Sequence, residues 1–309
     1  MLVRSFLIPS FFLLAVMPVH GTELFSDLAL KQGLNLSAVH SGATPLILGP
    51  ILQQPEAPDP AWRLAQWGTQ YSLEGAPVSV QNDGTRVMKN AAKEVVIHPG
   101  GLAGQGVTLT VNGGVEYGGA LRKKGEPWPH LLVEQRFETP VRLADYGTAP
   151  FRLDFRVERC EVATEKTVDP GAHTGQITAF FTVHNKNAES SDFNDMIWFG
   201  LPMFDVRYDL PPGHQALDIG KDDATGKFIC TLPGKDFYQG ATGDGKWHAL
   251  RGDLVSLLQD ALAASQAKGF LTHTAFEDLQ LTSFNLGWEV PGPYDCEITL
   301  KGLSLKGEG

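Results

Sequence analysis

Short runs in which apolar and polar residues alternate follow one another from residue 62 to the C-terminus. Examples are "HLLVEQRFE", "FRLDFRVERCEV" and "QITAFFTVHN", each bounded by residues typical of turns. A period of two places every second side chain on the same face of a strand. About ten such runs occur, a spacing that predicts an all-β chain, an antiparallel β-sandwich or barrel. The tripeptide Asn112-Gly113-Gly114 predicts one of the hairpin turns.

One segment follows a helical period instead. Its apolar residues fall on one helix face: Leu254, Leu257, Leu258, Ala261 and Leu262. Asp253 is a suitable N-cap, and Gly269 stands where a helix commonly ends. We therefore expect one α-helix near 253–268, packed on the outside of the sandwich.

The beginning of the chain has the pattern of a secretory signal peptide over residues 1–21. Arg4 precedes an apolar stretch shorter than the roughly 20 residues needed to span a membrane. Residues 22–60 are irregular and Pro-rich, so we expect an N-terminal arm or linker there, followed by one jelly-roll domain over 61–309. This organisation predicts a secreted or periplasmic protein with no membrane attachment after signal cleavage. The alternative for residues 1–21 is an uncleaved N-terminal anchor.

Charge and cysteine content narrow the classes of partner. The 309 residues include 25 basic and 35 acidic side chains, a net charge of −10, which argues against nucleic acid as a partner and against binding of anionic polymers. Neutral glycans, cations and basic proteins are the partners that this charge still allows.

The spacing of Cys and His indicates no zinc site, and we expect no metal and no cofactor. In an exported chain, Cys160, Cys230 and Cys296 predict one disulfide and one buried thiol, and the sequence does not choose the pair.

Two stretches combine polar and aromatic residues in a way that a core strand does not need. The first is "SDFNDMIWFGLPMFD" at 191–205, and the second is "FNLGWEVPG" at 284–292. Alternation places Glu289 on a polar face of the second stretch. An aromatic ring beside amides and a carboxylate suits the ring and the hydroxyls of a sugar. The residues expected to bind a polysaccharide or oligosaccharide are Asn194, Met196, Trp198 and Asn285.

These two stretches resemble the family-12 glycoside hydrolases, which are concanavalin-like jelly-roll endoglucanases and xyloglucanases. In that family one strand carries Glu, Met and Trp at alternate positions, and a late strand, preceded by a helix, carries Gln, Gly and Glu before a Pro. Here Met196 and Trp198 match the first motif, while Gly287, Glu289 and Pro291 match the second, with Asn in place of Gln. The resemblance covers roughly residues 176–305. It implies a concanavalin-like jelly roll with Glu289 as the acid/base.

The chain departs from the family at the nucleophile position, which is Asn194. An amide does not form the glycosyl ester of a retaining mechanism. Either the chain binds glycans without turnover, or Asp195 or Asp205 replaces the nucleophile, or an inverting enzyme uses a more distant base.

Hydrolysis of a neutral β-glucan-type polysaccharide is the leading hypothesis, with Glu289 and either Asp195 or Asp205 as the catalytic residues. The alternative is a carbohydrate-binding protein with no turnover. A third group of hypotheses contains a sandwich that binds no sugar and a jelly-roll polysaccharide lyase, whose candidate residues are Trp128, His130, Glu134 and Arg136. The oligomeric state is not predicted.

Overall fold

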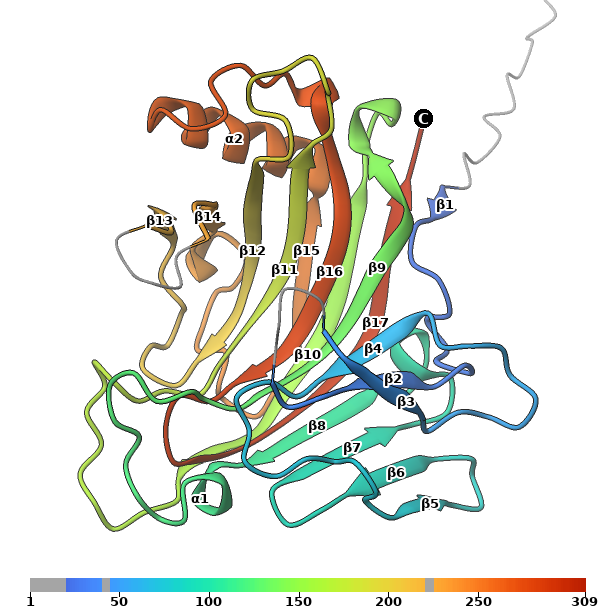
Figure 1. Ribbon diagram of the computed structural model, residues 1–309, viewed down its shortest axis with the longest axis vertical. Coiled ribbons are helices and arrows are strands. Elements are labelled where there is room, and N and C mark those ends of the chain that lie inside the picture. The colour runs from blue at the N-terminus through green and yellow to red at the C-terminus, as the bar shows by residue number, and fades with distance from the viewer. Residues whose placement is uncertain (1–20, 41–44, 220–224) are drawn as a thin grey trace, which may run out of the picture.

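Two β-sheets pack face to face in the computed structural model, which describes residues 21–40, 45–219 and 225–309 (Figure 1). Most neighbouring strands are antiparallel, and the parallel pairs are β12 with β14 and β2 with β4. The predicted all-β sandwich with one long α-helix is therefore confirmed. The predicted signal peptide falls, apart from Gly21, outside the described residues.

One sheet has nine strands and carries both stretches singled out above. In spatial order its strands are β13 (His214–Leu217), β14 (Phe228–Thr231), β12 (Met196–Asp205), β11 (Gln176–Asn185), β16 (Leu279–Glu289), β9 (His130–Arg142), β4 (Trp62–Ala65), β2 (Leu34–Ser37) and β3 (Ile47–Ile51). The two stretches lie on β12 and β16, and β11 separates them.

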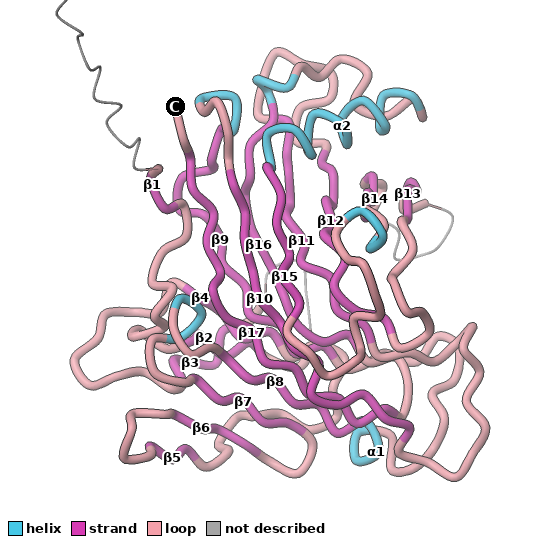
Figure 2. The backbone as a smooth tube through the Cα atoms, turned by 180° about the vertical axis from the view of Figure 1, so that it is seen from behind, coloured by secondary structure: helices cyan, strands magenta, loops and turns pink. Residues whose placement is uncertain are grey.

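The second sheet has eight strands and covers one face of the first. In spatial order its strands are β15 (His248–Asp253), β10 (Pro150–Val162), β17 (Tyr294–Gly307), β8 (Val107–Asn112), β7 (Lys93–Ile97), β6 (Arg86–Lys89) and β5 (Val78–Val80), with β1 (Thr22–Glu23) paired to β17. Helix α2 and strand β5 lie at opposite ends of the molecule in both views (Figures 1 and 2).

Helix α2 (Leu254–Ala267) packs against β12, β14 and β15. Its N-cap is Asp253, whose side chain accepts a hydrogen bond from the backbone N–H of Val255. Gly269, just beyond its end, has a positive φ of 80°, a conformation that glycine adopts without strain. The shorter helices are α1 (Gly113–Glu116) and the 3-10 turns η1 (Gly101–Ala103), η2 (Leu143–Asp145), η3 (Gly234–Asp236) and η4 (Phe276–Asp278).

The core lies between the two sheets, and β11 shows how the sequence sorts its side chains. Its odd-numbered residues from Ile177 to Val183 are fully buried, whereas the even-numbered ones from Gln176 to His184 are half-buried. The odd-numbered side chains pack against core residues of neighbouring strands. The rings of Phe181 and Phe284, for example, have centroids 4.8 Å apart. The even set defines the face of the nine-stranded sheet that is turned away from the eight-stranded sheet, here called the open face.

The segment 22–60, expected as an arm or linker, contributes strands to both sheets. β1 pairs with β17, and β2 lies between β3 and β4. Phe25 inserts into the aromatic core beside Phe284, at 5.0 Å between ring centroids. This segment is thus built into the sandwich. Among the residues that the structure describes, there is no helix with the length and apolar character needed to cross a membrane.

Candidate functional site

Four polar residues lie side by side on the open face, one on each of four adjacent strands. In order they are Asp205 on β12, Gln176 on β11, Glu289 on β16 and His130 on β9. Nε2 of Gln176 donates a hydrogen bond of 3.1 Å to Oε2 of Glu289. Oε1 of Glu289 accepts no hydrogen bond from the residues that the structure describes. Glu289 is therefore a half-buried carboxylate fixed at one oxygen and open at the other.

Asp205 is held much more tightly than Glu289. Its carboxylate is only 6% exposed and accepts hydrogen bonds from Thr174 at 2.8 Å and from Arg207 at both oxygens. The same contacts raise the pKa of Arg207, chiefly through its hydrogen bond to Asp205. Nη2 of Arg207 also donates to Oε1 of Gln176 at 3.3 Å. The amide of Gln176 thus connects this ion pair to Glu289.

Aromatic rings flank the other side of Glu289. His130 lies between Trp67, just after β4, and Trp128, with ring centroids 6.0 Å and 5.6 Å away. Nδ1 of His130 is 3.0 Å from the carbonyl oxygen of Trp128, which fixes the orientation of the imidazole ring. The indole N–H groups of Trp67 and Trp128 are buried without an acceptor among the described residues. We call Trp67, Trp128 and His130 the aromatic group.

Gly68 allows the two tryptophans to approach each other. Its φ is +64°, and a Cβ atom at this position would lie 2.2 Å from the carbonyl oxygen of Trp128. Gly287 has a similar structural role, because its Cβ would lie 2.1 Å from the carbonyl oxygen of Leu131 on β9. The missing side chain of Gly287 therefore permits strand pairing and leaves no space for a ligand.

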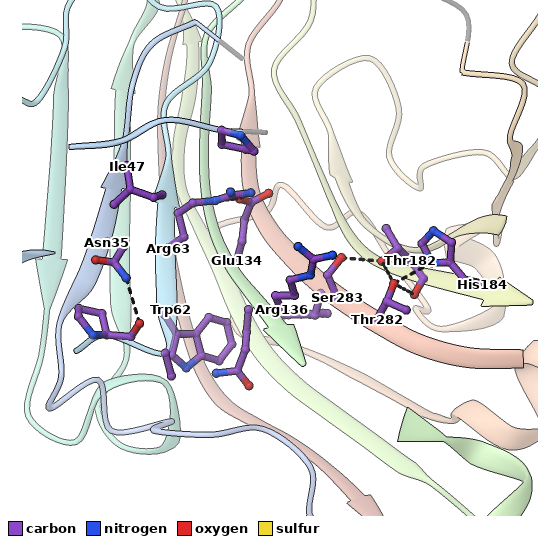
Figure 3. Close-up of a pocket in the computed structure, with 15 residues that line it drawn as sticks. Asn35, Ile47, Trp62, Arg63, Glu134, Arg136, Thr182, His184, Thr282 and Ser283 are labelled. Carbon is purple, nitrogen blue, oxygen red and sulfur yellow. Dashed lines mark hydrogen bonds and ion pairs between the residues drawn. The ribbon is translucent and has the colours of Figure 1, made fainter. Parts of the chain in front are cut away.

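A hollow of about 330 Å³ opens on the same face, nearer to β2 and β4 (Figure 3). Glu134 on β9 points into it, only 8% exposed, and Nε of Arg63 donates to its Oε2 at 2.6 Å. Burial raises the pKa of Glu134 even though Arg63 opposes the shift. Asn285 is the neighbour of Glu134 on β16, so this predicted sugar-binding residue lies beside the hollow.

A cluster of hydroxyl groups lies on the opposite wall of this hollow (Figure 3). Oγ1 of Thr182 is 2.7 Å from Thr282 and 2.5 Å from Ser283, and Nδ1 of His184 is 2.8 Å from Thr282. Burial lowers the pKa of His184 to about 4, with further contributions from Lys186, Lys227 and Arg136. His184 is therefore neutral at physiological pH and contributes a hydrogen-bonding ring to this wall.

The remaining predicted residues lie toward the α2 end of the open face. Trp198 is half-buried beside Thr182, and Met196 lies two residues away, nearly fully buried. Thr182 is six residues from Gln176 along β11, so about 20 Å of strand separates Trp198 from Glu289. Trp198 and Glu289 thus share one sheet and one face, but these two side chains do not converge on one reacting atom.

Asn194 and Asp195 are farther still from Glu289, in the turn that precedes β12. Asn194 is exposed with a positive φ of 67°, and its Oδ1 accepts a hydrogen bond from Lys186. The structure thus brings Asp205 and Glu289 together at one end of the open face and leaves Asn194, Asp195, Met196 and Trp198 at the other. Asn285 lies between these ends, four residues or about 13 Å from Glu289 along β16. The catalytic and binding roles of these residues stay predictions.

The aromatic group and the pair of Arg63 with Glu134 were not assigned to this site from the sequence. Three signals for them were present. "GEPWPHLLVEQRF" placed Trp128, His130 and Glu134 close together, Trp67 precedes a glycine, and Glu134 interrupts an apolar strand. What the sequence lacked was the strand order that brings His130 beside Glu289 and Glu134 beside Asn285.

Comparisons with known proteins give structural neighbours of low similarity. No family model matches the sequence, and no curated protein matches it. A family 12 xyloglucanase from Bacillus licheniformis is 10% identical, with a TM-score of 0.39 over 75% of this chain and 97% of its own. The endoglucanase Cel12A from Rhodothermus marinus is 11% identical, with a TM-score of 0.36 over 75% and 95%. A family 11 xylanase from Neocallimastix patriciarum is 9% identical, with a TM-score of 0.36 over 75% and 94%.

These neighbours include the family that the two sequence motifs resemble. Identities of 9–11% and TM-scores below 0.4 assign this chain neither to that family nor to an activity. The function is therefore inferred from the residues of the open face.

Proposed function

We propose that the chain binds a neutral polysaccharide on its open face, with the aromatic group as the platform and Glu289 beside it. The observation that carries this proposal is the position of Glu289 between the amide of Gln176 and the imidazole of His130, with Trp67 and Trp128 adjoining. Ligand sites typically combine aromatic surface with a few placed polar groups. The aromatic rings provide area for a sugar ring, and the amide and carboxylate provide partners for its hydroxyls.

Two arginines beside the open face are already paired with carboxylates. Arg63 is neutralised by Glu134 and Arg207 by Asp205, whereas Cζ of Arg122 lies over the ring of Trp128, 4.8 Å from its centroid. The net charge of −10 adds long-range repulsion against polyanions. The lyase hypothesis, which requires cationic recognition of uronic acids, is therefore the weaker one.

Replacing an aromatic residue tests the binding proposal. We expect Trp128→Ala to weaken binding to the best soluble polysaccharide of a panel containing β-glucan, xyloglucan and xylan by about tenfold or more, because roughly 1.4 kcal/mol corresponds to a factor of ten. Affinity electrophoresis and calorimetry measure this change. Trp247→Ala is a matched control, since Trp247 is 39% exposed and packs against Lys301 of the eight-stranded sheet. Equal losses in the two variants, or no binding by the wild type, would contradict the proposal.

Hydrolysis is a second candidate function. It is favoured by Oε1 of Glu289, which accepts no hydrogen bond from the part of the chain that the structure describes. In this mechanism Glu289 protonates the leaving oxygen, and Asp205 activates a water molecule. The two residues are two strands apart, about 10 Å between backbones, which is compatible with the roughly 6.5–9.5 Å between carboxyls of inverting enzymes. Asp205 must exchange its contact with Arg207 for water to act, so we expect slow turnover. Asp195, at the other end of the face, is less suitable.

Glu289→Gln separates binding from hydrolysis. If the chain is a hydrolase, we expect this variant to release reducing sugar at least about 100-fold more slowly, the typical contribution of a general acid, while binding the same polysaccharide. Asp192→Asn, in the turn before β12, is a control that removes a carboxylate at the far end of the face. Binding without sugar release by the wild type would leave the binding function alone. Equal release by wild type and Glu289→Gln would exclude Glu289 as the acid.

A further inference from the structure

Two of the three cysteines face each other across neighbouring strands. Cys160 on β10 and Cys296 on β17 are direct partners in an antiparallel pairing, and their Sγ atoms are 3.4 Å apart. Residues paired in this way have Cα atoms about 4.5–5.5 Å apart, which is within the range of about 4.4–6.8 Å that a disulfide requires. A bond between these sulfur atoms therefore needs only small side-chain rotations.

The absence of a side chain at Gly175 leaves room for the two sulfur atoms. A Cβ atom on Gly175 would lie 2.8 Å from Sγ of Cys160 and 2.9 Å from Sγ of Cys296. The carbonyl oxygen of Gly175 accepts a hydrogen bond from the N–H of Val206 at 3.1 Å. The cysteine pair thus packs against Gly175, the residue before Gln176, whose side chain donates the hydrogen bond to Glu289.

The two cysteines differ in access to solvent. Cys160 is half-buried and lines an open hollow of about 560 Å³ together with Val206 and Arg207. Cys296 is fully buried, and burial raises the pKa of its thiol. The third cysteine, Cys230, is buried on β14 in the other sheet, beside Gln215. An oxidant in solution therefore reaches Cys160 first, and Cys296 is the thiol placed to react next.

We propose that Cys160 and Cys296 form a reversible disulfide on exposure to a low-molecular-weight disulfide such as oxidised glutathione. The thiolate of Cys160 attacks one glutathione sulfur, giving a mixed disulfide and releasing one reduced glutathione. The thiolate of Cys296 then attacks Sγ of Cys160 and releases the second. The protein loses two protons and two electrons, and oxidised glutathione gains both, becoming two thiols. The bond joins β10 to β17, and Cys230 stays a free thiol.

Counting free thiols in the unfolded protein tests this pairing. After incubation with oxidised glutathione and removal of excess reagent, we expect one reactive thiol in wild type against three in the reduced protein. Intact mass should fall by about two hydrogen atoms, and peptide mapping should show residues 160 and 296 joined. The closed loop is long, so we expect the oxidised protein to unfold roughly 5 °C higher or more.

Two variants serve as controls. Cys230→Ser should retain two thiols when reduced and none when oxidised, with the same rise in unfolding temperature. Cys160→Ser should show no change of unfolding temperature on oxidation and no internal disulfide. Three free thiols in the treated wild type, a glutathione adduct that persists on Cys160, or a disulfide that includes Cys230 would each overturn the proposal. None of these readouts depends on polysaccharide binding.

Discussion

Single residues on the open face are placed by alternation, and this much the sequence predicts. The side chains of Glu289 and Trp198 lie on the same side of one sheet, because they are opposite Gln176 and Thr182, which share the half-buried face of β11. Their separation of about 20 Å depends on strand register, for which one sequence gives no signal. The contact of Gln176 with both Arg207 and Glu289 was unpredicted for the same reason.

His184 gives a pH dependence that belongs to one residue. Its pKa of about 4 in the folded chain is below the ordinary value near 6.5, so between these pH values the unfolded chain binds a proton that the folded chain does not. Stability therefore falls as pH decreases from about 6.5 to 4. The shift corresponds to roughly 3 kcal/mol, and we expect on the order of 2 kcal/mol from this group because the partly exposed ring is screened by solvent. Urea unfolding at several pH values measures it.

His184→Gln is the matched variant for this prediction. Glutamine keeps a hydrogen-bonding side chain near Thr282 but does not titrate. We expect a smaller loss of stability for the variant than for wild type over the same pH window, since the carboxylates contribute alike to both. Parallel pH profiles for the two proteins would show that His184 is not shielded as described.

At the scale of elements, the long helix was predicted and a short one was not. The residues Asn112-Gly113-Gly114 indicated a hairpin turn, yet Gly113–Glu116 form helix α1. The reason is Glu116, which is nearly fully buried and accepts hydrogen bonds from Lys93 at 2.6 Å and from the backbone of Gln70 at 2.8 Å. These contacts tie the end of α1 to β7 and to the segment after β4, so the shape of this turn depends on segments that are distant in the sequence.

The N-cap of α2 is a second test at this scale. Asp253 accepts hydrogen bonds from the N–H groups of Ala149 and Val255 and from Ser256. We expect Asp253→Ala to lower the free energy of unfolding by about 1–2 kcal/mol and Asp253→Asn, which keeps a capping oxygen, by less. Chemical denaturation compares the three proteins. Equal stability of Asp253→Ala and wild type would mean that the cap contributes nothing.

Asp253 also makes the stability of the fold depend on pH. Desolvation opposes ionisation of Asp253, but the hydrogen bonds from Ala149, Ser256 and Val255 together hold its pKa below the ordinary value. A lowered pKa in the folded chain stabilises it above about pH 4, and this contribution is lost as pH falls further. We expect wild type and Asp253→Asn to converge in stability at low pH.

For the molecule as a whole, the fold class was predictable from the sequence, but the expected start of the sandwich differs from the one in the structure. Residues 22–60 lack alternation because their strands are short and partly irregular, so they were expected outside the sandwich. Phe25, Leu30, Leu34 and Leu36 are nevertheless buried in the core. Short strands that pair only with distant segments leave little local pattern, which limits any boundary drawn from sequence.

Deletion of residues 22–60 tests whether this segment is part of the sandwich. A chain that starts at residue 61 loses those four core side chains, each contributing roughly 1.5–3 kcal/mol, a total comparable with the stability of an ordinary domain. We expect no cooperative thermal unfolding by circular dichroism. A chain that starts at residue 21 is the control and should unfold cooperatively. Similar transitions for both would show that residues 22–60 are dispensable.

The pairing of β1 with the end of β17 has a mechanical consequence. Thr22 lies opposite Gly307 and Glu23 opposite Lys306, and the two strands run antiparallel. Tension applied between these two ends acts perpendicular to the strands. It therefore breaks the hydrogen bonds between β1 and β17 one after another and does not load all of them together. The chain should therefore yield at low force from its ends, while the long strands of both sheets stay intact until that seam has opened.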